Sequence, residues 1–221
     1  MVAIFVVLTI LGFILIEIII NKFSSKTNNI PVQVKTKPVD SFRVPRGLFF
    51  YPGHTWASVL PSGKVTVGVD DFVHKIIGKV DEIKFRDIGD KVKQGQPMFE
   101  LRQSNRILQF SAPVDGVVKK VNSQLLQNIQ MMRDHPYSIG WLYQIEPNHL
   151  SMNLSRLLIG EKSVAWFRAE ITRFKDFIQS MSTMPNGLGQ TLQDGGIPAN
   201  GLLEQMDDKT WTKFEDNFLR R

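Results

Sequence analysis

The chain has 221 residues and a formal net charge of +6, with 43% hydrophobic and 22% charged residues. This length allows one or two domains, and this composition is typical of globular proteins that bury a core. No cysteine occurs in the sequence, so disulfides, thiolate catalysis, zinc ribbons and iron–sulfur clusters held by cysteine are excluded.

The first segment has the length and polarity of a membrane span. Residues Val2–Ile20 are apolar apart from Thr9, Gly12 and Glu17. Nineteen helical residues rise roughly 28 Å, which is close to the ~30 Å hydrocarbon thickness of a bilayer. The segment has neither the basic start nor the small-residue cleavage site of a signal peptide. We therefore predict that residues 1–21 form an uncleaved, single-pass transmembrane helix.

Basic residues predict the orientation of this helix. No lysine or arginine precedes the span, whereas Lys22, Lys26, Lys35 and Lys37 follow it closely. Because positively charged flanks remain in the cytoplasm, we expect the N-terminus outside and the soluble domain in the cytoplasm. Glu17 lies within about one turn of the cytoplasmic end. It therefore either reaches the lipid headgroups or contacts a helix of a partner subunit.

The stretch after the span, residues 22–47, is predicted to be a basic, proline-containing linker. It is polar and has no apolar period. Residues 21–47 contain six basic residues against the single acidic Asp40, which is a local charge of +5. This charge lies beside the predicted span, where it suits an anionic membrane surface. A nucleic-acid footprint would lie on the folded domain instead, so no nucleic-acid partner is expected.

Residues 48–147 have the pattern of a mainly β domain. Short runs of alternating polar and apolar residues, such as Lys64–Val69, recur between turn signals. Two apolar runs, Met98–Leu101 and Ile107–Phe110, flank the polar tip Arg102–Arg106. Many short strands at this spacing are typical of an antiparallel sandwich or a flattened barrel.

Helices are expected in two regions. Residues 70–77 are predicted to form a short helix that either Asp70 or Asp71 caps. Residues 148–221 are predicted to form a C-terminal helical extension, because apolar residues recur there at steps of three and four. The pattern is clearest between Val164 and Met181, and a second amphipathic stretch covers the region from residue 207 to 219.

Several short motifs recur in residues 48–147. They are His54-Thr55-Trp56, Val67–Phe72, Gly89-Asp90 with Gly95, Ala112–Gly116, Val121-Asn122 and Pro136–Leu142. Together and in this order they resemble the H protein of the glycine cleavage system. The resemblance implies a hybrid barrel-sandwich, lipoyl-like domain that is mainly β and is followed by C-terminal helices.

The resemblance also implies where a lipoyl group would be attached. In the family, the lipoylated lysine lies at the tip of a hairpin, eight residues before the proline of the next turn. Counting back from Pro113 reaches Asn105, and no lysine occurs between Lys93 and Lys119. Asparagine has no nucleophilic amine that could form the amide with lipoic acid. We therefore expect neither lipoate nor another cofactor on this chain.

The neighbours of Asn105 form a candidate docking tip. Arg102, Ser104 and Arg106 surround this position, and arginine side chains suit the recognition of carboxylates or phosphates. The alternative is a solvated loop tip. The histidines are scattered without metal-ligand spacing, and neither a catalytic triad nor a phosphate-binding loop occurs. No metal or catalytic site is therefore predicted, and the protein is not expected to be an enzyme.

Together these features favour a non-catalytic, membrane-anchored accessory or scaffold subunit. Its non-lipoylated H-protein-like domain would dock other subunits of an integral membrane complex. Two alternatives are a glycine-cleavage-type carrier and, less favoured, a membrane-fusion adaptor of transport systems. The adaptor would need long helical hairpins and a domain outside the cytoplasm, and the sequence predicts neither of them.

Overall fold

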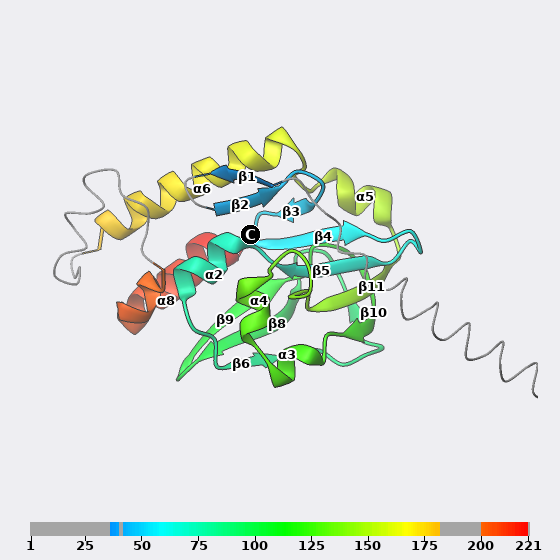
Figure 1. Cartoon of the computed structure of the whole chain (residues 1–221), viewed down its shortest axis with the longest axis horizontal. Helices are drawn as coiled ribbons and strands as arrows, with labels where there is room; N and C mark the ends of the chain where they lie inside the picture. Colours follow the sequence, from blue (N-terminus) through cyan, green and yellow to red (C-terminus); the bar gives the residue numbers. More distant parts are fainter. Residues whose placement is uncertain (1–35, 40–41, 182–199, 221) are drawn as a thin grey trace, which may run out of the picture. The chain divides into compact units, whose positions relative to one another are not determined.

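The computed structural model describes residues 36–39, 42–181 and 200–220. The transmembrane helix predicted for residues 1–21, with Val2–Ile20 and Glu17, lies outside this part of the chain. Among the residues that are described, no helix is both long enough and apolar enough to traverse a lipid bilayer. The described part is mainly β with helices toward the C-terminus, as the sequence predicts (Figure 1).

Two antiparallel sheets form the body of the domain. Their strands are β3 (Phe49–Tyr51), β4 (Thr55–Val59), β5 (Val65–Val69), β6 (Glu82–Lys84), β7 (Lys91–Val92), β8 (Pro97–Gln103), β9 (Arg106–Ser111), β10 (Gly116–Val121) and β11 (Tyr143–Pro147). The larger, six-stranded sheet has the order β3-β4-β5-β11-β10-β7, and the three-stranded sheet has the order β6-β8-β9. Each sheet therefore contains strands that are distant in the sequence.

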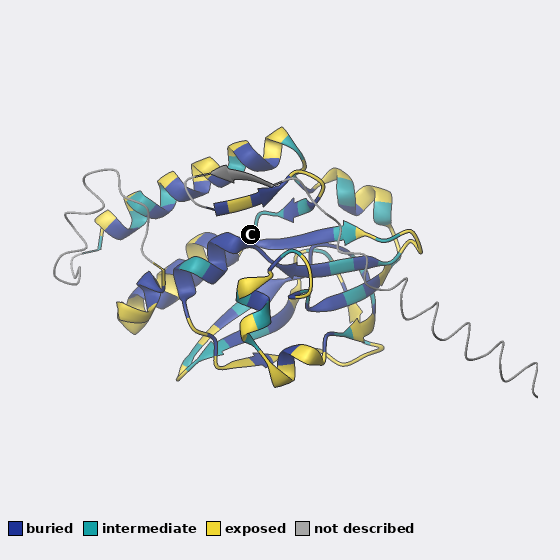
Figure 2. Cartoon of the chain, in the orientation of Figure 1, coloured by how far each residue is buried: buried dark blue, intermediate teal, exposed yellow. Residues whose placement is uncertain are grey.

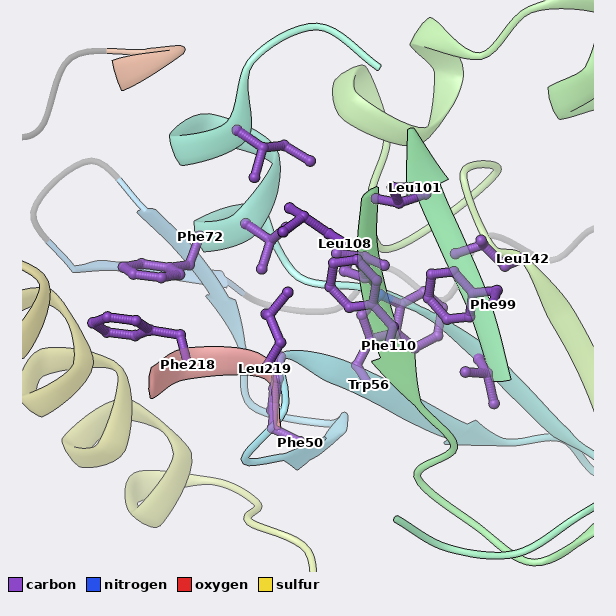
Figure 3. Packing of buried hydrophobic residues seen from close by; sticks show 14 of the residues in the cluster. Phe50, Trp56, Phe72, Phe99, Leu101, Leu108, Phe110, Leu142, Phe218 and Leu219 are labelled. Carbon is purple, nitrogen blue, oxygen red and sulfur yellow. Dashed lines mark hydrogen bonds between the residues drawn. The ribbon is translucent and has the colours of Figure 1, made fainter. Parts of the chain in front are cut away.

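The two sheets share one hydrophobic core. On β5, Val65, Val67 and Val69 follow the period of the pleat, and all three are fully buried. Phe99 on β8 and Phe110 on β9 stack with their ring centroids 5.0 Å apart (Figure 3). Buried residues of the strands and of the helices belong to this single cluster, and Figure 2 shows their distribution over the elements.

Short helices connect some of these strands. The helix predicted for residues 70–77 is confirmed as α2 (Asp71–Ile77). The Asp70 carboxylate caps it by accepting a hydrogen bond of 3.1 Å from the Val73 N–H. Two further helices, α3 (Gln124–Gln127) and α4 (Gln130–Asp134), lie between β10 and β11 and were not predicted from the sequence.

The structure differs from the linker predicted for residues 22–47, because the second half of that stretch is part of the fold. It contains two antiparallel strands, β1 (Thr36–Val39) and β2 (Phe42–Pro45). Phe42 and Val44 are fully buried, and their alternation around Arg43 is the local signal of a strand. The prolines are compatible with this hairpin because both strands of a two-stranded sheet are edges, where proline is tolerated.

The C-terminal extension folds onto the same core as the sheets. Helix α6 (Glu161–Gln179) contacts β1 and β2, and Figure 1 shows it lying along this hairpin. Its buried side chains recur at three- and four-residue steps, as predicted; they include Val164, Phe167, Ile171, Phe174 and Ile178. The other elements of the extension are α5 (Leu150–Ser155), η1 (Leu202–Gln205), α8 (Asp208–Phe214) and η2 (Glu215–Leu219).

Candidate functional site

The β8–β9 hairpin places Asn105 at an exposed tip. Gln103 and Arg106 are the last paired residues, so the turn consists of Ser104 and Asn105. Ser104 has a φ of 53°, in the left-handed region that tight hairpin turns require. Both turn residues are exposed to solvent. A side chain at position 105 is therefore accessible from outside, but the asparagine carboxamide offers no amine for acylation.

The backbone of the tip is anchored to the loop that follows α2. The Ser104 N–H donates a hydrogen bond of 2.8 Å to Asp81 Oδ2, and this bond lowers the pKa of the Asp81 carboxyl. The Gln103 amide donates to the carbonyl oxygens of Ile77 and Lys79. These contacts hold the tip of the hairpin against the domain.

Arg106 is bound by the C-terminal part of the chain. Its Nε lies 2.8 Å from Asp208 Oδ1, and its Nη2 donates to the Met206 carbonyl at 2.7 Å. The guanidinium carbon also lies 5.2 Å from the centroid of the Trp211 ring, which is cation–π geometry. The charge of Arg106 is thus largely engaged within the molecule.

Arg102 lies on the other face of the hairpin. In an antiparallel pair, directly opposed residues point to the same face and consecutive residues point to opposite faces. Arg102 is paired with Ile107, whereas Arg106 is paired with Gln103. Arg102 instead forms ion pairs with Glu100 at 3.1 Å and Glu82 at 3.6 Å. The structure therefore does not bring Arg102 and Arg106 together on one face of the hairpin. That the tip docks a partner stays a prediction.

Residues 201–220, named here the C-terminal cap, cover the outer side of this hairpin. The Glu215 carboxylate accepts a hydrogen bond of 3.1 Å from the Gln109 N–H on β9. Glu204 accepts one of 3.1 Å from the Gln103 amide near the tip. Buried apolar residues fix the cap to the core; they are Leu202, Leu203, Met206, Trp211, Phe214, Phe218 and Leu219. The packing of Phe218 against Phe72 of α2 is visible in Figure 3.

Only part of this arrangement could be predicted from the sequence. The apolar spacing of Trp211, Phe214 and Phe218 indicates an amphipathic helix, but it does not indicate the surface that the helix covers. The polar partners of Arg106 lie about one hundred residues later in the chain, and no local pattern connects them. Glu204 and Asp208, which contact residues beside the tip, were therefore not predicted from the sequence.

A second polar cluster is buried between α6 and the start of β4. His54 Nδ1 lies 2.8 Å from Asp70 Oδ2, and His54 Nε2 lies 3.9 Å from Glu170 Oε2. Arg173 pairs with the same Glu170 oxygen at 2.6 Å. His54 and Asp70 are fully buried, whereas the Arg173 side chain is 32% exposed. The cluster joins α6 to the start of β4. Within the described residues, no group of three or more His, Asp and Glu side chains is placed to hold a metal ion.

The residues of the recognised motifs have structural roles. Trp56 Nε1 donates to the carbonyl oxygens of Val69 at 3.0 Å and Pro136 at 3.1 Å. The Asn122 amide donates to the carbonyl oxygens of Ile139 at 2.9 Å and Trp141 at 2.7 Å. These bonds satisfy buried backbone groups and tie the connection between β10 and β11 to the main sheet. The motifs therefore account for the scaffold rather than for chemistry at the tip.

Comparisons with known proteins identify the same scaffold. The family model described as "Glycine cleavage H-protein" matches residues 48–170. The chain is 30% identical over 131 residues to the probable glycine cleavage system H protein of Pyrococcus abyssi, which covers 59% of this chain and 97% of that protein. It is 29% identical over 131 residues to glycine cleavage system H protein 2 of Aquifex aeolicus, which covers 59% and 81% of the two chains.

A solved structure is also similar. The crystal structure of a glycine cleavage system H protein from Mycobacterium marinum has 21% sequence identity and a TM-score of 0.49, with 55% of this chain and 97% of that chain covered. The resemblance found in the motifs is thus confirmed by the family match, which includes the hairpin and Asn105. The chain belongs to the glycine cleavage H-protein family.

Proposed function

We propose that this protein is a non-catalytic accessory subunit that uses a non-lipoylated H-protein-like domain to dock other proteins in a membrane complex. The observation that carries this proposal is Asn105 at the exposed tip of the β8–β9 hairpin. A lipoyl carrier needs a nucleophilic amine at that place, and the carboxamide nitrogen is only a hydrogen-bond donor. Without a covalent arm, the remaining activity of the domain is surface contact.

The C-terminal cap supports this proposal. It engages Arg106 through Asp208 and Met206, and it engages Gln103 through Glu204. The flank of the tip is therefore already covered by the protein's own chain. A partner would meet a surface built jointly by the hairpin and the cap, whose outward residues include Lys209 and Lys213.

The membrane part of the proposal depends on the sequence before residue 36. Val2–Ile20 and the basic residues after it favour a single-pass anchor with the domain in the cytoplasm. An ionisable residue such as Glu17 in an apolar span commonly faces another protein. We therefore propose integral membrane subunits as the partners, with Glu17 as a contact to one of their helices.

Two measurements on the native protein test the proposal. We expect its intact mass to match the unmodified chain, whereas a lipoyl increment would establish the glycine-cleavage-type carrier instead. We expect the full-length chain to sediment with membranes and a variant lacking residues 1–21 to remain in the supernatant. Affinity purification from detergent-solubilised membranes should then recover integral membrane proteins in fixed ratio to the chain. Recovery of the chain alone would contradict the accessory role.

A further inference from the structure

The six-stranded sheet has an outer face that points away from the hydrophobic core. The register of β4, β5, β11 and β10 places one row of residues side by side: Ser58, Thr66, Gln144 and Lys120. Directly opposed residues of an antiparallel pair point to the same face of the sheet. All four side chains are exposed or half-buried, so this row lies on the outer face.

This outer face is basic. Among the described residues, the outward positions of β7, β10 and β11 and the turn before β5 hold four lysines against the single carboxylate of Glu146. Lys119 pairs with Glu146 at 2.6 Å, and it lowers the pKa of that carboxyl together with the more weakly acting Lys64. Lys91 and Lys120 form no ion pair with another described residue. We name the four lysines and the strands between them the lysine face.

Exposed apolar residues adjoin the lysine face where β10 ends. Lys120 Nζ lies 5.6 Å from the centroid of the half-buried Trp141 ring. Asn122, directly after β10, donates to the carbonyl oxygens of Ile139 and Trp141, so it holds this loop beside the start of α3. Ile139 is 44% exposed, and Leu126 on α3 is 69% exposed. Figure 2 shows that most of α3 is exposed. We name Leu126, Ile139 and Trp141 the apolar edge.

This combination suits an anionic lipid surface better than an acidic protein. Lysine is a point charge on a flexible stem, so it attracts anionic headgroups without a fixed geometry. Paired recognition of protein carboxylates favours arginine, and none of the four cations of the lysine face is an arginine. Exposed leucine and isoleucine side chains enter the boundary between headgroups and acyl chains, where tryptophan is enriched.

We propose that the lysine face and the apolar edge dock onto an anionic lipid leaflet. The lysines would lie among the headgroups, and Leu126 and Ile139 would insert beside them. This docking rests on the proposed function, whose anchor supplies the bilayer, but it uses neither the hairpin tip nor the C-terminal cap. It would hold the folded domain against the membrane in one orientation.

A single fluorescent label tests the docking, because the chain contains no cysteine. Gln127→Cys, at an exposed position on α3, receives a polarity-sensitive fluorophore. The full-length chain is then placed in nanodiscs of phosphatidylcholine, with or without phosphatidylserine. We expect emission at shorter wavelength only with phosphatidylserine. The shift should disappear at about 1 M salt, where the Debye length is about 3 Å.

The same label on α6 is the control for position. Thr172→Cys is exposed, and α6 and α3 lie on opposite sides of the domain in Figure 1. Its emission should be the same in both kinds of nanodisc. An unshifted label at position 127 in the presence of phosphatidylserine would overturn the proposal. An equal shift in both lipids would also overturn it, because anionic headgroups would then be irrelevant.

A pair of double variants tests the charges. Lys91→Gln with Lys120→Gln removes two lysines that form no ion pair with a described residue. The ratio of docked to free domain should fall about 25-fold, because each lysine near an anionic surface contributes about fivefold. Lys209→Gln with Lys213→Gln removes two exposed lysines from α8 and should leave the ratio unchanged. Equal losses in the two double variants would reject the lysine face as the site.

A second substitution tests the apolar edge. Leu126→Ser with Ile139→Ser keeps the charge and removes apolar side chains that are already exposed. The ratio of docked to free domain should fall about tenfold or more, because burial of one such side chain contributes about tenfold. Ile107→Ser, at a position 48% exposed on β9, is the matched control. Docking that is as strong in Leu126→Ser with Ile139→Ser as in the wild type would refute the insertion.

Failure of the anchor and failure of the docking give different results. A full-length chain that does not enter nanodiscs lacks the anchor, whereas a chain in the discs with an unshifted label lacks the docking. In the first case, flotation of the same chain with phosphatidylserine vesicles tests the lysine face. Flotation should be lost with phosphatidylcholine vesicles and reduced in Lys91→Gln with Lys120→Gln. A chain that does not float with phosphatidylserine vesicles would reject the docking as well.

Discussion

Arg106 at the end of the β8–β9 hairpin and Asp208 in the C-terminal cap form an ion pair of 2.8 Å between Nε and Oδ1. This pair joins residues that are 102 positions apart in the sequence. It places the protein's own C-terminal residues beside Asn105. The sequence alone predicts that this surface contacts an external partner, because Arg102 and Arg106 flank Asn105. The physical question is how strongly the cap is held.

We expect the cap to be held by its apolar residues rather than by this ion pair. Asp208 is 87% exposed, so Asp208→Asn should lower the free energy of unfolding by only about 0–1 kcal/mol. Trp211→Ala removes a side chain that is 4% exposed and should cost about 3–5 kcal/mol. Urea unfolding of the full-length chain in detergent measures both, with Asp216→Asn on the same cap as the control. Equal losses for the two variants would contradict the argument.

The tip should accept a lipoyl group once an amine is restored. Asn105→Lys changes an exposed residue, so the free energy of unfolding should change by no more than about 0.5 kcal/mol. Coexpression with a lipoate–protein ligase should then add a lipoyl increment to the intact mass. Ile107→Lys is the matched control, because Ile107 is exposed on the same hairpin but lies off the tip. Modification of both lysines, or of neither, would show that position 105 no longer has the geometry of an attachment site.

The pair between His54 and Asp70 should contribute more to the free energy of unfolding than a helix cap does. Asp70 both caps α2 and pairs with His54 while fully buried. Asp207 caps α8 by accepting from the Thr210 N–H at 2.9 Å, but it is exposed. Asp207→Ala should therefore lower the free energy of unfolding only slightly. Asp70→Ala should cost about 3–5 kcal/mol, because it leaves a buried partner unpaired. Chemical denaturation measures the free energy of unfolding of both variants. Similar decreases for the two would mean that Asp70 acts only as a helix cap.

Stability should fall as the solution becomes more acidic, in part because of His74. Burial lowers its pKa to about 4 in the folded state, below the unfolded value of 6.5, so the unfolded chain binds more protons between these values. The contribution of His74 is fully present above about pH 6.5 and is lost as the pH falls toward 4. Within this window, the His74 contribution to the free energy of unfolding changes by up to about 1.4 kcal/mol per pH unit.

Substitution of two histidines isolates that contribution. His74→Gln should flatten the pH dependence of the free energy of unfolding between about pH 4 and 6.5. His135→Gln changes an exposed histidine and should leave the slope as it is in the wild type. Denaturant titrations at several pH values provide the measurement. If the free energy of unfolding of His74→Gln depended on pH as it does in the wild type, groups other than His74 would be responsible for the loss of stability in acid.

The strands and short helices that depend on local pattern were predictable. Alternation indicates β5, β8 and β9, and the turn between the last two places Asn105 at a tip. The acidic residue before α2 indicates its cap. These features follow from the period of the backbone and from hydrogen bonds between near neighbours, so a short window of sequence contains them.

The β1–β2 hairpin shows the limit of composition as a guide. Its prolines and polar residues resemble a linker, while Phe42 and Val44 give an alternation only two members long. What stabilises the hairpin lies elsewhere in the chain: α6 packs on it, and Asp71 of α2 accepts from the Arg43 N–H at 2.8 Å. A two-stranded sheet is marginal by itself, so its formation depends on these distant contacts.

The sequence by itself determined the family of the scaffold, the strand pattern and the absence of an amine at position 105. Each of these features depends on single residues or on their immediate neighbours in the sequence. Only the tertiary structure decided that Arg102 and Arg106 lie on opposite faces, that the C-terminal cap occupies Arg106, and that Lys64 and Lys120 lie on one face of the sheet. Those relationships join residues many tens of positions apart. They arise from the register of paired strands and from the burial of apolar faces against one another, which a local pattern does not encode.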